Sequence, residues 1–161
     1  MFSVRPAQQS DAQAVEAVFA AAGLVPCKDF PQIDEPTIVA VKGDALLGAV
    51  EGRFDAGEYP EGCLLADAQS PRAWIDRIGV LPSAHRLGIG TSLVRAFAEA
   101  AESSGCHHVA LMIDESTDRT VRIEFFKQCG LLPLMTPGAP RDAHLGNLVS
   151  AVLQATSQPA S

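Results

Sequence analysis

The spacing of apolar residues changes along the chain between two periods, which separate expected strands from expected helices. Residues 37–41 form an almost unbroken apolar run, which is typical of a buried strand. Residues 89–101 carry apolar side chains three and four positions apart, which is the stripe of one helical face. These patterns predict strands over residues 2–5, 37–41, 45–54, 73–81, 109–113 and 131–135, and helices over residues 10–23, 90–103 and 118–130.

The order of these elements predicts an α/β fold. Strands and helices follow one another as β-α-β-β-β-α-β-α-β, and such alternation places helices on both faces of a central sheet. Residues 136–142 are rich in Pro and Gly, and residues 145–152 then show helical spacing of Leu and Val. We expect this tail, residues 136–161, either to cover a sheet edge or to pack on a partner subunit, which would make the protein a homodimer.

Composition limits the class of protein. The chain has 161 residues, 47% hydrophobic and 19% charged, which fits a single domain over residues 1–161. Its formal net charge of −7 argues against nucleic acid as a partner. It has neither an apolar run of the roughly 18 residues that span a membrane nor a signal-peptide core, so we expect a cytoplasmic protein. The cysteines, which suit a reduced compartment and form no metal-binding pair, are Cys27, Cys63, Cys106 and Cys129.

One segment, residues 78–91, carries the clearest chemical signal. An apolar strand ends at Pro82, a basic turn with two glycines follows, and a helix begins near Gly90. Gly88 and Gly90 lack a Cβ and would let the backbone approach a ligand. The first N–H groups of a helix have no partner within it, and the helix dipole favours negative charge there. With the cation of Arg86 added, this turn predicts a phosphate or pyrophosphate site.

Three kinds of phosphate site compete for this turn, besides an ordinary β-α turn that binds nothing. A P-loop requires Lys after its last glycine, and Thr91 follows Gly90 here. A dinucleotide fingerprint requires a third glycine, where Leu93 stands. The third kind is a coenzyme A site. Arg-Ile-Gly-Val-Leu-Pro at 77–82 and His-Arg-Leu-Gly-Ile-Gly at 85–90 closely resemble the signature of the GNAT superfamily of N-acetyltransferases.

The resemblance covers roughly residues 2–135 and implies a fold and a cofactor. It implies a mixed, mostly antiparallel central sheet flanked by helices. The helical tail departs from it, because family members usually close with a seventh strand. It also implies that acetyl-CoA lies between the fourth and fifth strands, near Gly79, with its pyrophosphate on the turn amides. The cofactor-binding residues that follow from it are Ile78, Gly79, Val80, His85, Arg86, Leu87, Gly88, Ile89, Gly90, Thr91, Arg119 and Phe126.

A second similarity lies nearer the C-terminus and departs from the family at important positions. Phe-Phe-Lys-Gln-Cys-Gly-Leu at 125–131 resembles the helix-ending Phe-Tyr-x-x-x-Gly-Phe of the family. The family's Tyr, often the acid for the departing thiolate, is Phe126 here, and its ring could be either core or cofactor wall. Arg119 replaces a frequent Asn, and His85 replaces the leading Gln or Arg of the glycine signature. Arg119 and Arg122 share a helical face with Phe126, so either guanidinium could stabilise the thiolate or a CoA phosphate.

The resemblance implies an acyltransferase that moves the acetyl group of acetyl-CoA to a primary amine. We expect direct attack by the amine, since the chain has no recognisable activated nucleophile pair. Two carboxylates are candidates for the catalytic base, Glu51 on the third strand and Asp76 on the fourth. Asp76 shares strand parity with Trp74 and Ile78, so we expect either apolar neighbours and a raised pKa, or an ion pair with an arginine of its own strand.

The sequence leaves the acceptor open. Loops at residues 24–36 and 55–71 are expected to select it, and a polyamine, an amino acid, an antibiotic or a protein amine would each suit the chemistry. No metal is expected to take part. Phe126 keeps a second class open, a non-catalytic acetyl-CoA-binding or regulatory module in which the fold survives and catalysis is lost.

Overall fold

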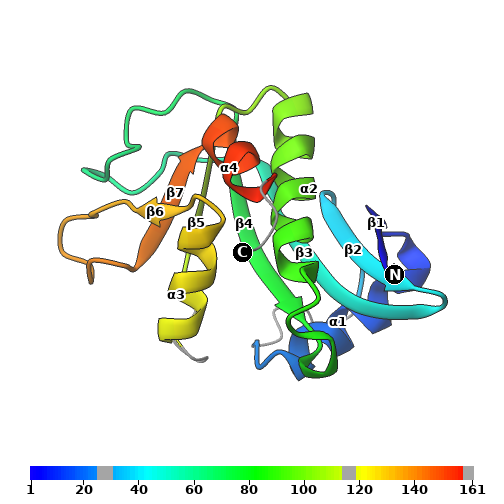
Figure 1. The fold of residues 1–161 in the computed structure, drawn as a ribbon. Helices are drawn as coiled ribbons and strands as arrows, with labels where there is room; N and C mark the ends of the chain where they lie inside the picture. The colour runs from blue at the N-terminus through cyan, green and yellow to red at the C-terminus, as the bar shows by residue number, and fades with distance from the viewer. Residues whose placement is uncertain (25–30, 114–118, 158–161) are drawn as a thin grey trace.

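A mixed sheet of seven strands organises the described residues, which are 1–24, 31–113 and 119–157 of a computed structural model (Figure 1). Its order is β1-β2-β3-β4-β5-β7-β6, and every neighbouring pair is antiparallel except β4–β5, which α2 connects. The strands are β1 Ser3–Pro6, β2 Thr37–Lys42, β3 Ala45–Ala56, β4 Arg72–Val80, β5 His108–Met112, β6 Leu132–Pro133 and β7 His144–Leu148. The helices are α1 Ala12–Ala21, α2 Ile89–Ser103, α3 Arg119–Gln128 and α4 Val149–Thr156. The predicted α/β class is confirmed, whereas Cys27 and the expected helix start at residue 118 lie outside the described residues.

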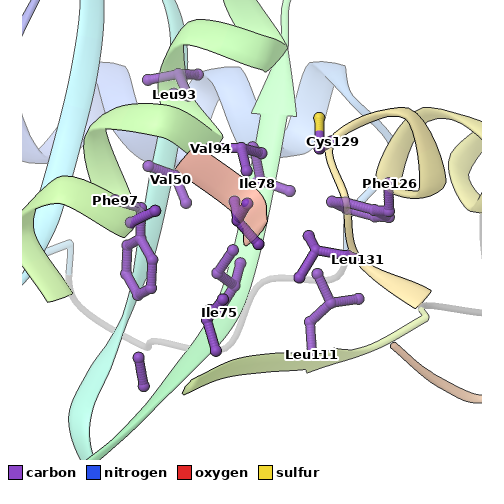
Figure 2. Packing of buried hydrophobic residues seen from close by; sticks show 14 of the residues in the cluster. Val50, Ile75, Ile78, Leu93, Val94, Phe97, Leu111, Phe126, Cys129 and Leu131 are labelled. Carbon is purple, nitrogen blue, oxygen red and sulfur yellow. The ribbon is translucent and has the colours of Figure 1, made fainter. Parts of the chain in front are cut away.

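Different elements cover the two faces of the sheet. Helices α2, α3 and α4 pack on one face over the largest apolar cluster, part of which is drawn in Figure 2. Helix α1 covers β2 and β3 on the other face through Val15 and Phe19, and the segment around Tyr59 and Cys63 covers β4 and β5. The expected helices on both faces are therefore present.

Helix α2 supplies the deepest contacts of the main cluster. Its predicted stripe is buried, since Leu93, Phe97 and Ala101 are 0% exposed. Gly52 on β3 makes room for Phe97, because a Cβ there would lie 2.7 Å from the ring. Truncating a buried Phe to Ala costs about 3–5 kcal/mol of unfolding free energy, so this packing fixes α2, and the turn before it, against the sheet.

The C-terminal residues differ from the helical tail that we expected. Residues 144–148 form β7, which lies between β5 and β6, and only Val149–Thr156 form a helix. The helical interpretation of 144–148 was wrong because a short apolar run suits either element, and α4 follows β7 without a break. Strand β7 supplies the seventh strand that the family usually has, and α4 packs against α2.

A bulge in β4 changes which of its side chains share a face. The pairing with β3 shifts by one residue between Ile75 and Arg77, which leaves Asp76 as an extra residue. Asp76 keeps the face of Trp74, since Arg53 pairs with Trp74 in the sheet and forms the ion pair with Asp76, but the expectation that it also shares a face with Ile78 is wrong. Ile75 and Ile78 both belong to the main cluster, while Trp74 packs on the opposite face.

Candidate active site

Strands β4 and β5 pair only over their first residues and then part. Within the described residues their parallel ladder ends at Ile75 and Leu111. Leu81 donates its N–H to a carbonyl of β3 over 2.8 Å, and alternate residues of a strand point their backbone groups to opposite sides. The N–H and C=O groups of Ile78 and Val80 therefore face the gap between β4 and β5.

Two side chains contact the carbonyl groups of this open edge. Nε2 of His85 lies 3.1 Å from the Val80 oxygen, and Nη2 of Arg122 lies 3.5 Å from the Ile78 oxygen. The edge thus already accepts contacts from groups outside the sheet. The amides of a pantetheine arm could bind in the same way, as an added strand does.

The glycine turn joins this edge to the start of α2. Residues 85–88 are exposed, and Arg86 and Gly88 have φ of 68° and 79°, left-handed conformations that turn the chain sharply. The first N–H groups of α2 lie at the same end of the molecule as the C-terminal end of β4 (Figure 1). Because these groups have no partner within the helix, the geometry suits an anion.

The two glycines of the turn serve different purposes. A Cβ at Gly88 would meet no atom within 4 Å, so Gly88 is needed there for its positive φ. A Cβ at Gly90 would lie 2.9 Å from the ring of Phe125. Gly90 therefore lets α3 pack against α2, and the expectation that it lets the backbone approach a ligand stays a prediction. Only its backbone remains a candidate ligand contact.

Two hollows meet where β4 and β5 part. The smaller, about 30 Å³, reaches Arg122 and Phe126 on α3. The larger, about 480 Å³, opens beside Trp74 and Arg119, so the two arginines, three residues apart on α3, line different hollows. The residues that line both hollows are Ile75, Asp76 and Met112. A carboxylate thus lies at the junction between them.

Asp76 is partly exposed and ion-paired. Its Oδ1 and Oδ2 lie 3.2 and 3.3 Å from Nη2 and Nε of Arg53, and 36% of its side chain is exposed. The apolar enclosure that we expected is contradicted, and the arginine comes from β3 instead of its own strand. Because an exposed pair is typically worth about 0–1 kcal/mol, a ligand ammonium could replace Arg53 at little cost.

Glu51 has a very different environment. It is 6% exposed, and its Oε1 accepts a hydrogen bond from Nε of Arg77 at 2.7 Å. Arg77 also donates to Glu16 of α1 at 2.6 Å, and its guanidinium lies 4.2 Å from the ring centre of Phe19. These buried contacts tie α1 to β3 and β4.

Within the described residues, no tyrosine lines either hollow. Phe126 is 2% exposed in the main cluster (Figure 2) and also lines the smaller hollow. The only tyrosine of the chain, Tyr59, is buried and donates its hydroxyl to the Ala73 carbonyl at 2.8 Å. Burial raises the pKa of Tyr59, so its hydroxyl is a poor proton donor.

Trp74, which lines the larger hollow, lies beside a histidine that the sequence did not connect with it. Trp74 and Met112 contribute the apolar wall of this hollow, and the rings of Trp74 and His144 lie 6.4 Å apart. Nδ1 of His144 is 3.1 Å from Oγ1 of Thr136, and burial lowers the pKa of His144. No sequence spacing connects these residues, because they meet only through the pairing of β4, β5 and β7.

Neither a metal cluster nor a membrane span is found among the described residues. They contain no group of His, Cys, Asp and Glu side chains that could hold a metal ion. Their helices are too short or too polar to cross a bilayer. The described cysteines are buried free thiols, namely Cys63, Cys106 and Cys129.

Known proteins share this fold. The model of the acetyltransferase (GNAT) family matches residues 11–131. The chain resembles the structure of yncA from Salmonella typhimurium with its cofactor acetyl-CoA (14% identity, TM-score 0.61, 92% of this chain and 94% of that chain). It also resembles the ribosomal-protein-S18-alanine N-acetyltransferase from Escherichia coli (12% identity, TM-score 0.64, 92% and 94%). A third similar structure is Eis1 from Mycobacterium abscessus (21% identity, TM-score 0.62, 82% of this chain), of whose chain this one spans only 31%. No curated protein sequence is significantly similar to the chain.

A mixed sheet with two parted strands, followed by a strand–turn–helix, is the fold of an acetyltransferase. The chain belongs to the GNAT family of acetyltransferases, since the family model matches well over half of its length. It is thus an acyltransferase whose acetyl donor is acetyl-CoA.

Proposed function

We propose that this chain transfers the acetyl group of acetyl-CoA directly to a primary amine. The parting of β4 and β5 beyond Ile75 carries this proposal, together with Asp76 at the junction of the two hollows. A thioester between the strands and an amine in the larger hollow would approach each other at this carboxylate.

The donor would lie along the open edge of β4. Its pantetheine amides would pair with the backbone of Ile78 and Val80, and N–H groups of residues 86–91 would hold the pyrophosphate. His85 would leave the Val80 carbonyl or share it, since a carbonyl oxygen has two lone pairs. The exposed turn supports this arrangement, because phosphate groups could reach it without a change in the core.

The acceptor would depend on a base. An alkyl ammonium such as that of lysine has a pKa of about 10.4 and a thiol about 8.5, so at neutral pH the amine needs more help than the thiolate. Asp76 lines the larger hollow and could take the proton directly or through water. Glu51 remains the alternative base, but its buried pair with Arg77 supports a role in fixing α1 against the sheet.

A panel of primary amines tests the proposal, with thiol release from acetyl-CoA and product mass as readouts. We expect at least one amine to be acetylated, with one thiol released per amide formed. Acetyl-CoA should raise the melting temperature, and NAD and ATP should do so much less. Binding without any turnover would favour the regulatory module, and equal shifts from all three ligands would contradict the acetyl-CoA site.

A further inference from the structure

The CoA thiolate that leaves during acetyl transfer has no tyrosine to protonate it in this protein. Phe126 lacks a hydroxyl, and Tyr59 is buried with its hydroxyl bonded to Ala73. Negative charge still develops on sulfur as the carbon–sulfur bond breaks. A positioned group that stabilises this charge would lower the barrier to transfer.

Two arginines line the smaller hollow, and they differ in where their guanidinium groups are held. Arg77 donates to Glu16 and Glu51 on the α1 side of the sheet. Arg122 reaches from α3 to β4, where its Nη2 lies 3.5 Å from the Ile78 oxygen. Its guanidinium is also 5.6 Å from the ring centre of Phe126, one helical turn further along α3. Arg122 is thus the cation beside both the open strand edge and the ring that replaces tyrosine.

We propose that Arg122 stabilises the CoA thiolate and so replaces the tyrosine that this chain lacks. The inference rests on the proposed function, because it requires the donor to lie between β4 and β5. The amine nitrogen bonds to the acetyl carbon, the carbon–sulfur bond breaks, and its electron pair moves to sulfur. The amine proton passes to Asp76 or water. Arg122 keeps its own proton and donates a charge-assisted hydrogen bond to sulfur, and solvent protonates the thiolate after it leaves.

A cation at this place has a consequence that does not depend on the acceptor. A positive charge within about 4–6 Å favours the charged form of an acidic group and lowers its pKa by about 1–3 units. The thiol of CoA bound to the protein should therefore ionise at lower pH than the thiol of free CoA. A structural arginine that only packs on Phe126 would leave this titration unchanged.

The test measures the ultraviolet absorbance of the thiolate against pH in the complex with CoA, while calorimetry confirms binding. In the wild-type complex we expect ionisation at least about one pH unit below that of free CoA. Arg122→Gln should remove most of this shift, and Arg122→Lys should keep most of it. Arg95→Gln, which removes an exposed arginine paired with Glu99 on α2, should have no effect.

Failure of this inference differs from failure of the proposed function. No binding of CoA to the wild-type protein would contradict the donor site itself. Normal binding with an unshifted thiol in the wild-type complex would overturn the role of Arg122, whether or not the variants fold. An equal shift in wild type and Arg122→Gln would overturn it too. Once an acceptor amine is known, Arg122→Gln should lower kcat about 10²-fold. Adding Phe126→Tyr should raise kcat much more in the Arg122→Gln variant than in the wild-type protein.

Discussion

The two sides of the gap beside β4 present different kinds of group. On the proposed donor side, backbone groups of Ile78 and Val80 face the gap, and the exposed turn at residues 85–88 follows them. On the proposed acceptor side, the hollow is lined by side chains such as Asp76 and Trp74. Backbone groups require only a strand, a turn and a helix start, whereas a side chain matters only if it points the right way. A sequence signature can therefore specify the donor site while leaving the acceptor site undetermined.

Removing the carboxylate at the junction should give the largest effect. Asp76→Asn should lower kcat about 10²–10⁴-fold at neutral pH, because the acceptor ammonium loses its base. Part of the loss should return at high pH, where free amine is abundant. Steady-state rates across pH with one reactive amine measure this.

Glu51→Gln is the matched control for Asp76→Asn, because it removes the other candidate base, which lies on the neighbouring strand β3. It should reduce kcat much less and the melting temperature more, because Glu51 is buried in an ion pair. A larger loss of rate in Glu51→Gln than in Asp76→Asn would reverse the assignment of the base.

Losses of stability should likewise distinguish the two ion pairs of Arg77 from the exposed pair of Arg53 with Asp76. Arg77→Met leaves Glu16 and Glu51 buried without their guanidinium partner and should cost about 3–5 kcal/mol of unfolding free energy. Arg53→Met breaks the exposed pair with Asp76 and should cost about 1 kcal/mol or less. Urea denaturation of both variants measures this, and equal losses would show that the pairs of the two arginines are not buried differently.

Acetyl-CoA affinity should depend on the backbone conformation of the turn before α2. Gly88→Ala places a side chain at φ 79° and should cost about 1–2 kcal/mol of stability and weaken acetyl-CoA binding about tenfold. Gly43, with φ 60° and equally open space, provides the matched control in the β2–β3 hairpin. Gly43→Ala should cost similar stability without changing affinity measured by calorimetry. Equal affinities of the two variants would make the Gly88 turn purely structural.

The same comparison explains how far the sequence predicts this protein. The turn at 78–91 could be predicted because its strand, glycines and helix stripe are local patterns. The environment of Asp76 could not, because a bulge in β4 moves Ile78 to the other face of the strand and because its ion-pair partner, Arg53, comes from another strand. The prediction of a helix over residues 144–148 was wrong for a related reason, since the place of this strand between β5 and β6 is decided by long-range pairing.

The smallest expected effect is a pH dependence of stability that arises from buried histidines. Burial lowers the pKa of His144 in the folded protein, so below about pH 6.5 the unfolded chain binds more protons. Stability should therefore fall as the pH is lowered through this range. His108, whose pKa burial and His107 also lower, adds an effect of the same sign.

Trp74, the only tryptophan of the chain, reports this change through its fluorescence because its ring lies beside His144. His144→Gln should flatten both the fluorescence change and the loss of stability between pH 7.5 and 5.5. An unchanged profile in this variant would exclude His144 as the source. Acetyl-CoA affinity should vary little over the same range.

The central claim is that acetyl-CoA pairs with the open edge of β4, and amide hydrogen exchange tests it most directly. Saturating acetyl-CoA should slow exchange at the N–H groups of Ile78 and Val80. Leu81, whose N–H is already bonded to β3, should change little and serves as the internal control. Tight binding that leaves the amides of Ile78 and Val80 unprotected would contradict the claim.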